Sequence, residues 1–103
     1  MSTIKDTISQ DLKTAMKASD TMCRDTLRMA LSEIKSAEIS RRGSEDVKKM
    51  TDDDILQILN KMIKQRRESI EQFVQAERHE LAEKEQKELA ILQKYLPKQL
   101  EPA

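Results

Sequence analysis

The stretch that decides the fold runs from Thr51 to Val74, TDDDILQILNKMIKQRRESIEQFV. It opens with a threonine that can cap a helix and with aspartates whose negative charge suits a helix N-terminus. No glycine or proline interrupts the stretch, and good helix formers fill its polar positions. This pattern predicts a long central helix. Its large apolar side chains recur at helical spacing and form one stripe: Ile55, Ile58, Leu59, Met62, Ile63, Ile70 and Phe73.

Two further helices are predicted on the N-terminal side of this stretch. Thr3 and Asp6 are spaced as a capping box, and the apolar positions after them indicate a first helix that ends near Ser19. A second helix is predicted over Thr21–Arg42, after a short polar break whose side chains cap helices well. It ends at Gly43, the only glycine of the chain, because glycine accepts the left-handed conformation that follows a helix.

The sequence after the central helix contains no clear stop signal before Pro97. The apolar stripe of Leu81, Leu89, Leu92 and Tyr95 is displaced by about 60–70° from that of the central helix, so one straight helix would not bury both. We therefore expect a break over Ala76–His79, followed by a fourth helix over Glu80–Leu96. The predicted fold is an all-α, four-helix antiparallel bundle with a long central helix.

Composition excludes some classes of protein. At 103 residues the chain has the size of one domain, and its charged share of 37% equals its hydrophobic share, as expected for helices with solvated outer faces. The net charge of zero argues against strong nonspecific attraction to nucleic acid or anionic membranes, although a local basic stripe stays compatible with it. A single cysteine, no signal peptide and no apolar run near the roughly 20 residues that span a bilayer indicate a cytoplasmic protein without membrane attachment.

Reactive side chains are sparse. Cys23 lies on an apolar stripe, where it is expected to pack as a small hydrophobic residue, and His79 lies at the expected helix break. The run from His79 to Glu83 resembles the zinc motif H-E-x-x-H but has glutamate in place of the second histidine. Asp52, Asp53 and Asp54 are expected to be partners of the helix dipole rather than a cation site. We predict no catalytic residues, no metal site and no cofactor.

Basic residues supply the candidate binding sites. Lys61, Lys64 and Arg67 form a cationic flank on the central helix, and Arg66 falls within its apolar stripe. An arginine in that position either forms an ion pair with a glutamate of a neighbouring helix, which we favour, or opens a cationic groove that contacts phosphates. A second, supporting group consists of Arg24 and Arg28, four residues apart on the second helix and beside Asp25.

Methionines supply a different candidate. Met22 and Met29 lie off the main apolar stripe of the second helix. Flexible methionine side chains suit a surface that receives a partner helix. These residues therefore predict a possible role as a protein–protein adaptor.

Four separated motifs resemble YqeY-like proteins of the GatB/YqeY family, and the likeness covers nearly the whole chain in order. They are Thr26-Leu27-Arg28-Met29 with Ile34-Lys35 and Ala37-Glu38-Ile39, Lys64-Gln65-Arg66-Arg67-Glu68-Ser69, Leu81-Ala82-Glu83-Lys84-Glu85, and Tyr95-Leu96-Pro97-Lys98-Gln99-Leu100. The resemblance implies that residues 1–96 are a helical N-terminal domain. It also implies that residues 97–103 begin a linker to a three-helix C-terminal domain that is absent from this sequence. Glu77 departs from the family, where a glycine is expected at the turn between helices.

The resemblance also implies a function. Members are small cytosolic proteins similar to the tail of the GatB component of the tRNA-dependent amidotransferase, a tail associated with tRNA recognition rather than with chemistry. We therefore expect a noncatalytic module that binds tRNA or a translation-associated protein. The alternatives are the adaptor described above and a component of a carbon–nitrogen ligase with glutamine as amido donor, active only within a complex.

Overall fold

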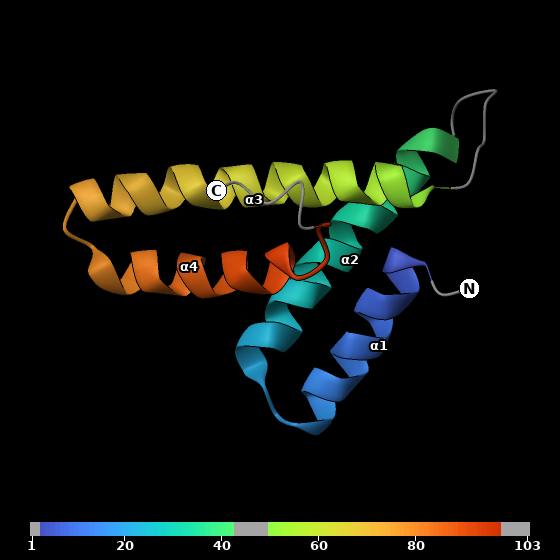
Figure 1. The fold of residues 1–103 in the computed structure, drawn as a ribbon, viewed down its shortest axis with the longest axis horizontal. Coiled ribbons are helices and arrows are strands. Elements are labelled where there is room, and N and C mark those ends of the chain that lie inside the picture. The colour runs from blue at the N-terminus through green and yellow to red at the C-terminus, as the bar shows by residue number, and fades with distance from the viewer. Residues whose placement is uncertain (1–2, 43–49, 98–103) are drawn as a thin grey trace.

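The computed structural model describes residues 3–42 and 50–97, and the described residues form four α-helices (Figure 1). The all-α four-helix bundle predicted from the sequence is confirmed. Each helix lies within a few residues of its expected position, and the break after the central helix falls over Ala76–Arg78. The bounds are Ile4–Lys17 for α1, Thr21–Arg42 for α2, Asp52–Gln75 for α3 and His79–Gln93 for α4.

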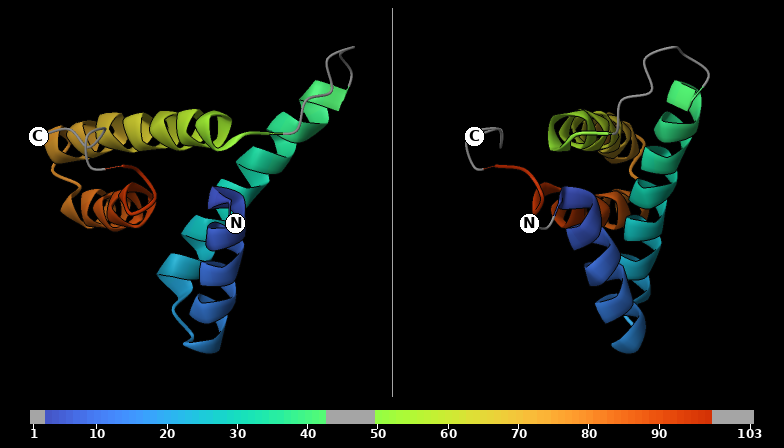
Figure 2. Two further views of the ribbon diagram at one scale, coloured as in Figure 1. Left: turned by 45° about the vertical axis from the view of Figure 1, so that its right-hand side comes forward. Right: turned by 90° about the vertical axis from the view of Figure 1, so that its right-hand side faces the viewer.

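The bundle consists of two antiparallel hairpins that cross each other. In Figure 1, α3 and α4 lie side by side along the longest axis, and α1 and α2 form a second hairpin that runs across one end of the first. The views in Figure 2 show that the connected ends of α3 and α4 project away from this crossing. Helix α2 packs against α1, α3 and α4, in agreement with the central position expected from its apolar residues.

The hydrophobic core lies where the hairpins cross. Its fully buried aliphatic side chains come from every helix, and half-buried Leu12, Cys23, Ile58 and Leu89 pack around them. Leu81 is an exception to the predicted stripe of α4, since it is 39% exposed, and Ala82 beside it is buried. The core cluster contains Ile8, Leu27, Ala30, Ile34, Ile55, Leu59, Met62, Ile63, Leu92 and Leu96.

Local hydrogen bonds explain where the helices begin. Capping boxes form at Thr3 with Asp6 and at Thr51 with Asp54, in each case with the threonine side chain accepting from the aspartate backbone N–H. The Asp20 carboxylate accepts from the backbone N–H of Cys23 at 3.1 Å and caps α2. The N-cap of α4, Arg78, makes no side-chain capping bond.

Helices α1 and α3 end in the same motif. In α1, the backbone N–H groups of Ser19 and Asp20 donate to the carbonyls of Met16 and Ala15, and the corresponding bonds recur in α3 around Glu77. This is a Schellman motif, which requires a left-handed residue just after the helix. Ser19 has φ 54° and Glu77 has φ 58°, so non-glycine residues occupy the left-handed position in both turns. Glu77 thus stands where the resemblance calls for glycine, whereas Gly43 lies outside the described residues.

Candidate nucleic-acid interface

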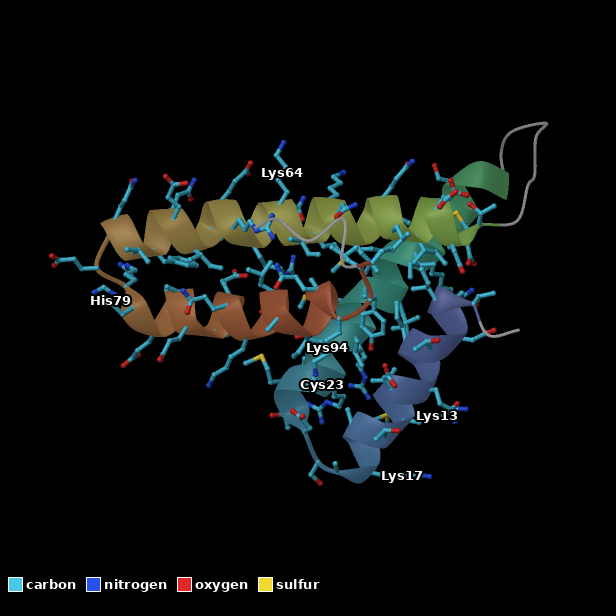
Figure 3. The ribbon with its side chains drawn as sticks, in the orientation of Figure 1. Lys13, Lys17, Cys23, Lys64, His79 and Lys94 are labelled. Carbon is cyan, nitrogen blue, oxygen red and sulfur yellow. The ribbon has the colours of Figure 1, made fainter. Side chains whose placement is uncertain are left out.

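The cationic segment of α3 comprises residues 61–67. Lys61, Lys64, Arg66 and Arg67 are its charged residues, and no carboxylate occurs between Ile55 and Arg67. The side chains of Lys61 and Lys64 are exposed, and that of Arg67 is half-buried. In Figure 3, Lys64 projects outward from α3 on the side opposite α4. Lys61 and Lys64 therefore present positive charge to solvent on the outer side of α3.

Arg66 forms the internal ion pair that the sequence analysis favoured. Its Nε atom lies 3.7 Å from Oε2 of Glu88 on α4, and the two side chains are only 12% and 9% exposed. One terminal NH₂ group donates to the carbonyl of Met62 at 3.2 Å, and the other lies 3.5 Å from the sulfur of Met29 on α2. Arg66 thus connects three helices, and its head group faces inward rather than into solvent.

The environment of this ion pair is unfavourable for its negative partner. Burial raises the pKa of Glu88, the neighbouring Glu85 raises it further, and Arg66 lowers it by less. The buried Nε of Arg66 also lacks a hydrogen-bond partner among the described residues. The pair therefore positions the helices but contributes little to the free energy of unfolding. Buried charges gain little when the distance between their nitrogen and oxygen atoms is too long for a hydrogen bond.

Arg24 and Arg28 lie apart from the exposed lysines of α3. Both line a groove at the connected end of the α1–α2 hairpin, at the bottom of Figure 1, whereas residues 61–67 lie on α3 at the top. The Arg24 Nε atom donates to the neighbouring Asp25 at 3.0 Å, and Arg28 is exposed. The structure therefore does not join the two basic groups predicted from the sequence into one patch.

The two candidate methionines differ in exposure. Met29 is 37% exposed and covers part of the Arg66 head group, whereas Met22 is half-buried. Lys61 also lines a groove that sequence reasoning missed, with a volume of about 300 Å³. Its other lining residues are Ala37 from α2, Met50 before α3, and Asp54, Gln57 and Ile58 from α3, so one carboxylate shares the groove with Lys61. It is formed by residues far apart in the sequence, so periodicity alone could not find it.

Comparison with known proteins identifies the family. The family model described as "Yqey-like protein" matches residues 5–103. The chain belongs to the YqeY-like family.

Several curated relatives of this YqeY-like chain are yeast proteins. An uncharacterized protein of Schizosaccharomyces pombe is 41% identical over 90 residues, which are 87% of this chain and 69% of that protein. "Altered inheritance of mitochondria protein 41, mitochondrial" of Kluyveromyces lactis is 41% identical over 88 residues, which are 85% of this chain and 45% of that protein. The protein of the same name in Clavispora lusitaniae is 42% identical over 86 residues, or 84% of this chain and 47% of that protein. The chain thus spans under half the length of these two mitochondrial relatives.

The names of these relatives state a cellular location for the relatives and not for this chain. The proteins of K. lactis and C. lusitaniae are named as mitochondrial, so a cytoplasmic location of this YqeY-like chain stays a prediction. No helix among the described residues combines the length and the apolar character needed to cross a membrane.

The reactive side chains of this YqeY-like domain lie apart. Cys23 is on α2 beside Lys94, and His79 is at the distant tip of the other hairpin (Figure 3). Burial, and next the charge of Asp20, raise the pKa of the Cys23 thiol, which disfavours the nucleophilic thiolate. Within the described residues no group of three His, Cys, Asp or Glu side chains could hold a metal ion. Asp52 accepts a hydrogen bond from the backbone N–H of Ile4 at 3.0 Å and so connects α3 to the start of α1.

Proposed function

We propose that this YqeY-like chain is a noncatalytic helical module that binds tRNA through phosphate contacts made by the cationic segment of α3. The observation that carries the proposal is the exposure of Lys61 and Lys64 on a segment that contains no carboxylate. Lysines and arginines on a helix face bind phosphates without reading the base sequence. Recognition of tRNA is what the family resemblance implies, and the helical fold supplies a rigid surface for it.

The ion pair inside the bundle assigns different roles to neighbouring residues of this segment. Since the Arg66 head group contacts Met62, Met29 and Glu88, it is the positioning residue that holds α3 against α2 and α4. Phosphate contacts then fall to Lys61 and Lys64, with the half-buried Arg67 at the end of the segment. A surface held in register by an internal contact loses less conformational entropy on binding than a mobile one does.

The test is a titration of tRNA at about 50 mM and about 200 mM salt with a double variant, Lys61→Gln/Lys64→Gln. The loss of two phosphate contacts lowers the affinity for tRNA by about tenfold and reduces the slope of log affinity against log salt by about 1 to 2. The matched control is Lys13→Gln/Lys17→Gln, which removes the same charge from exposed lysines of α1 (Figure 3). Equal losses in both variants would show a general effect of net charge and refute the assignment to α3.

A second candidate function is the protein–protein adaptor, which the exposure of Met29 favours. A partner helix docked on Met29 and Met22 would bury apolar area, and its affinity would change little with salt. Met29→Lys would abolish such docking, whereas Lys61→Gln/Lys64→Gln would leave it intact. The same salt series therefore separates the two functions.

A further inference from the structure

The groove at the connected end of the α1–α2 hairpin has a lining suited to an anion. Its volume is about 290 Å³. It combines two guanidinium groups, two hydroxyl groups and a small apolar wall, and none of its described lining residues carries a carboxylate. The lining residues are Ala15, Met16, Ser19, Thr21, Arg24 and Arg28.

The two arginines project from one face of α2 because they are four residues apart. Asp25 is bonded to Nε of Arg24, and the terminal NH₂ groups of Arg24 take part in no hydrogen bond or ion pair within the described residues. Arg28 is exposed and has no ion-pair partner among them. The guanidinium groups of both arginines thus have N–H donors available, and the paired donors of a planar guanidinium match the oxygens of a phosphate group.

The turn between α1 and α2 sorts its polar side chains onto two sides. Ser19, held at φ 54° by the bonds that end α1, and Thr21 line the arginine groove. Asp20, between them, is bonded to the backbone N–H of Cys23 and lines a different groove, the one next to Tyr95. The hydroxyl groups therefore face the arginines, while the one carboxylate of the turn is directed elsewhere.

We propose that this groove binds a phosphate monoester, with the dianion between Arg24 and Arg28 and with the hydroxyls of Ser19 and Thr21 as further donors. The monoester is the terminal phosphate of an RNA or that of a small phosphorylated metabolite, since both offer the same oxygens. The groove lies near the α1–α2 turn, whereas Lys64 points outward from α3 (Figure 3), and the site does not depend on the function proposed above.

The test is a titration with inorganic phosphate at constant ionic strength, followed by NMR at the backbone amides of Ser19 and Thr21. The proposal requires saturable shifts of both amides. Arg24→Gln/Arg28→Gln weakens phosphate binding by about tenfold or more, because charge-assisted hydrogen bonds are lost. The control Lys13→Gln/Lys17→Gln removes the same charge from neighbouring α1 and changes binding by about twofold at most. Shifts that rise linearly without saturation, or an equal loss in the control, would overturn the proposal.

Two further arms test the geometry and the source of the phosphate. Arg28→Lys keeps the charge but loses the planar guanidinium, and we expect binding to weaken by about threefold. An RNA oligonucleotide with a 5′-phosphate displaces inorganic phosphate from the groove, and the same oligonucleotide with a 5′-hydroxyl does not. If the two oligonucleotides compete equally, the site does not recognise a monoester. Lys61→Gln/Lys64→Gln leaves phosphate binding unchanged, so failure of this site and failure of the α3 site are distinguishable.

Discussion

The two hairpins have the same kind of turn but different support around it. Both α1 and α3 end in a Schellman motif with a non-glycine residue, Ser19 or Glu77, in the left-handed position. After Ser19, the Asp20 side chain caps α2, whereas Arg78 makes no side-chain cap for α4. The comparison shows that the same backbone motif can occur in two settings. In the α1–α2 turn a local side-chain bond also stabilises the start of the next helix, whereas the start of α4 lacks such a bond and depends on packing.

Packing decreases along the α3–α4 hairpin toward its connected end. Near the crossing, Leu59 and Leu92 are fully buried, but near the connected end Val74 is 46% exposed and Leu81 is 39% exposed. A segment with few buried apolar contacts and no cap opens more easily than the core does. We therefore expect the α3–α4 turn to open more easily than the crossing of the hairpins.

The largest expected effect contrasts two leucines on α4. Leu92→Ala removes a fully buried side chain at the crossing and lowers the free energy of unfolding by about 2–5 kcal/mol. Leu81→Ala, the same chemical change near the turn, lowers it by about 0.5 kcal/mol or less, because Leu81 is already partly in water. Urea denaturation followed by circular dichroism measures both. Similar losses would mean that the turn is as well packed as the crossing.

Sequence patterns predicted the helices because the signals that begin and end them are local. The capping pair Thr51 and Asp54 and the polar break at Ser19 lie within a few residues of the boundaries they determine. The stripe beyond Phe73 extends along the whole of α4, and its displacement shows only that a break precedes it. The crossing of the hairpins was not predictable in the same way. The crossing depends on which faces of α2 pack against α3 and α4. Periodicity identifies the apolar face of a helix but does not tell which other helix covers that face.

The second largest effect concerns the ion pair of Arg66 and Glu88. Glu88→Leu leaves the Arg66 guanidinium mostly buried without its anion and lowers the free energy of unfolding by about 3 kcal/mol. Arg66→Met removes the opposite partner and is destabilising for the same reason. The double variant Arg66→Met/Glu88→Leu returns to within about 1 kcal/mol of the native protein, since apolar side chains of similar size can replace a buried pair. A double-mutant cycle from urea denaturation measures this coupling. Additive losses would show that the two charges act independently.

The sequence predicted that Arg66 pairs with a glutamate of a neighbouring helix, but it did not predict which glutamate. Helix α4 offers Glu80, Glu83, Glu85 and Glu88. Only Glu88 is both buried and close to Arg66, because it lies one turn before buried Leu92 on the inner face of α4. The four-residue spacing between Glu88 and Leu92 could have identified the partner from the sequence. The separation of Arg24 and Arg28 from the α3 lysines could not be predicted from the sequence, because it follows from the crossing of the hairpins.

A smaller effect is the pH dependence caused by Glu88. Burial raises its pKa in the folded state, so the folded protein takes up the proton at a higher pH than the unfolded chain does. The contribution of this site to stability therefore increases as the pH falls from neutral through the raised pKa. It stops increasing below the ordinary glutamate pKa of about 4.3, where the unfolded chain is protonated as well. We expect the native protein to gain stability relative to Glu88→Gln over this range. The measurement is urea denaturation of both proteins at a series of pH values, and a constant difference would contradict the raised pKa.

The smallest effect tests the turns themselves. A glutamate in the left-handed conformation costs about 1 kcal/mol or more, and glycine removes that cost but has greater freedom in the unfolded chain. Glu77→Gly therefore stabilises the protein by about 0.5–1 kcal/mol net, and Ser19→Gly does the same at the other turn. The two variants differ in where the gain is seen. Glu77→Gly slows amide hydrogen exchange in the first turn of α4 by about threefold to fivefold, because that uncapped turn opens locally. Ser19→Gly changes exchange there only through the global unfolding reaction. Equal exchange profiles in the two variants would mean that the α3–α4 turn opens only together with the whole bundle.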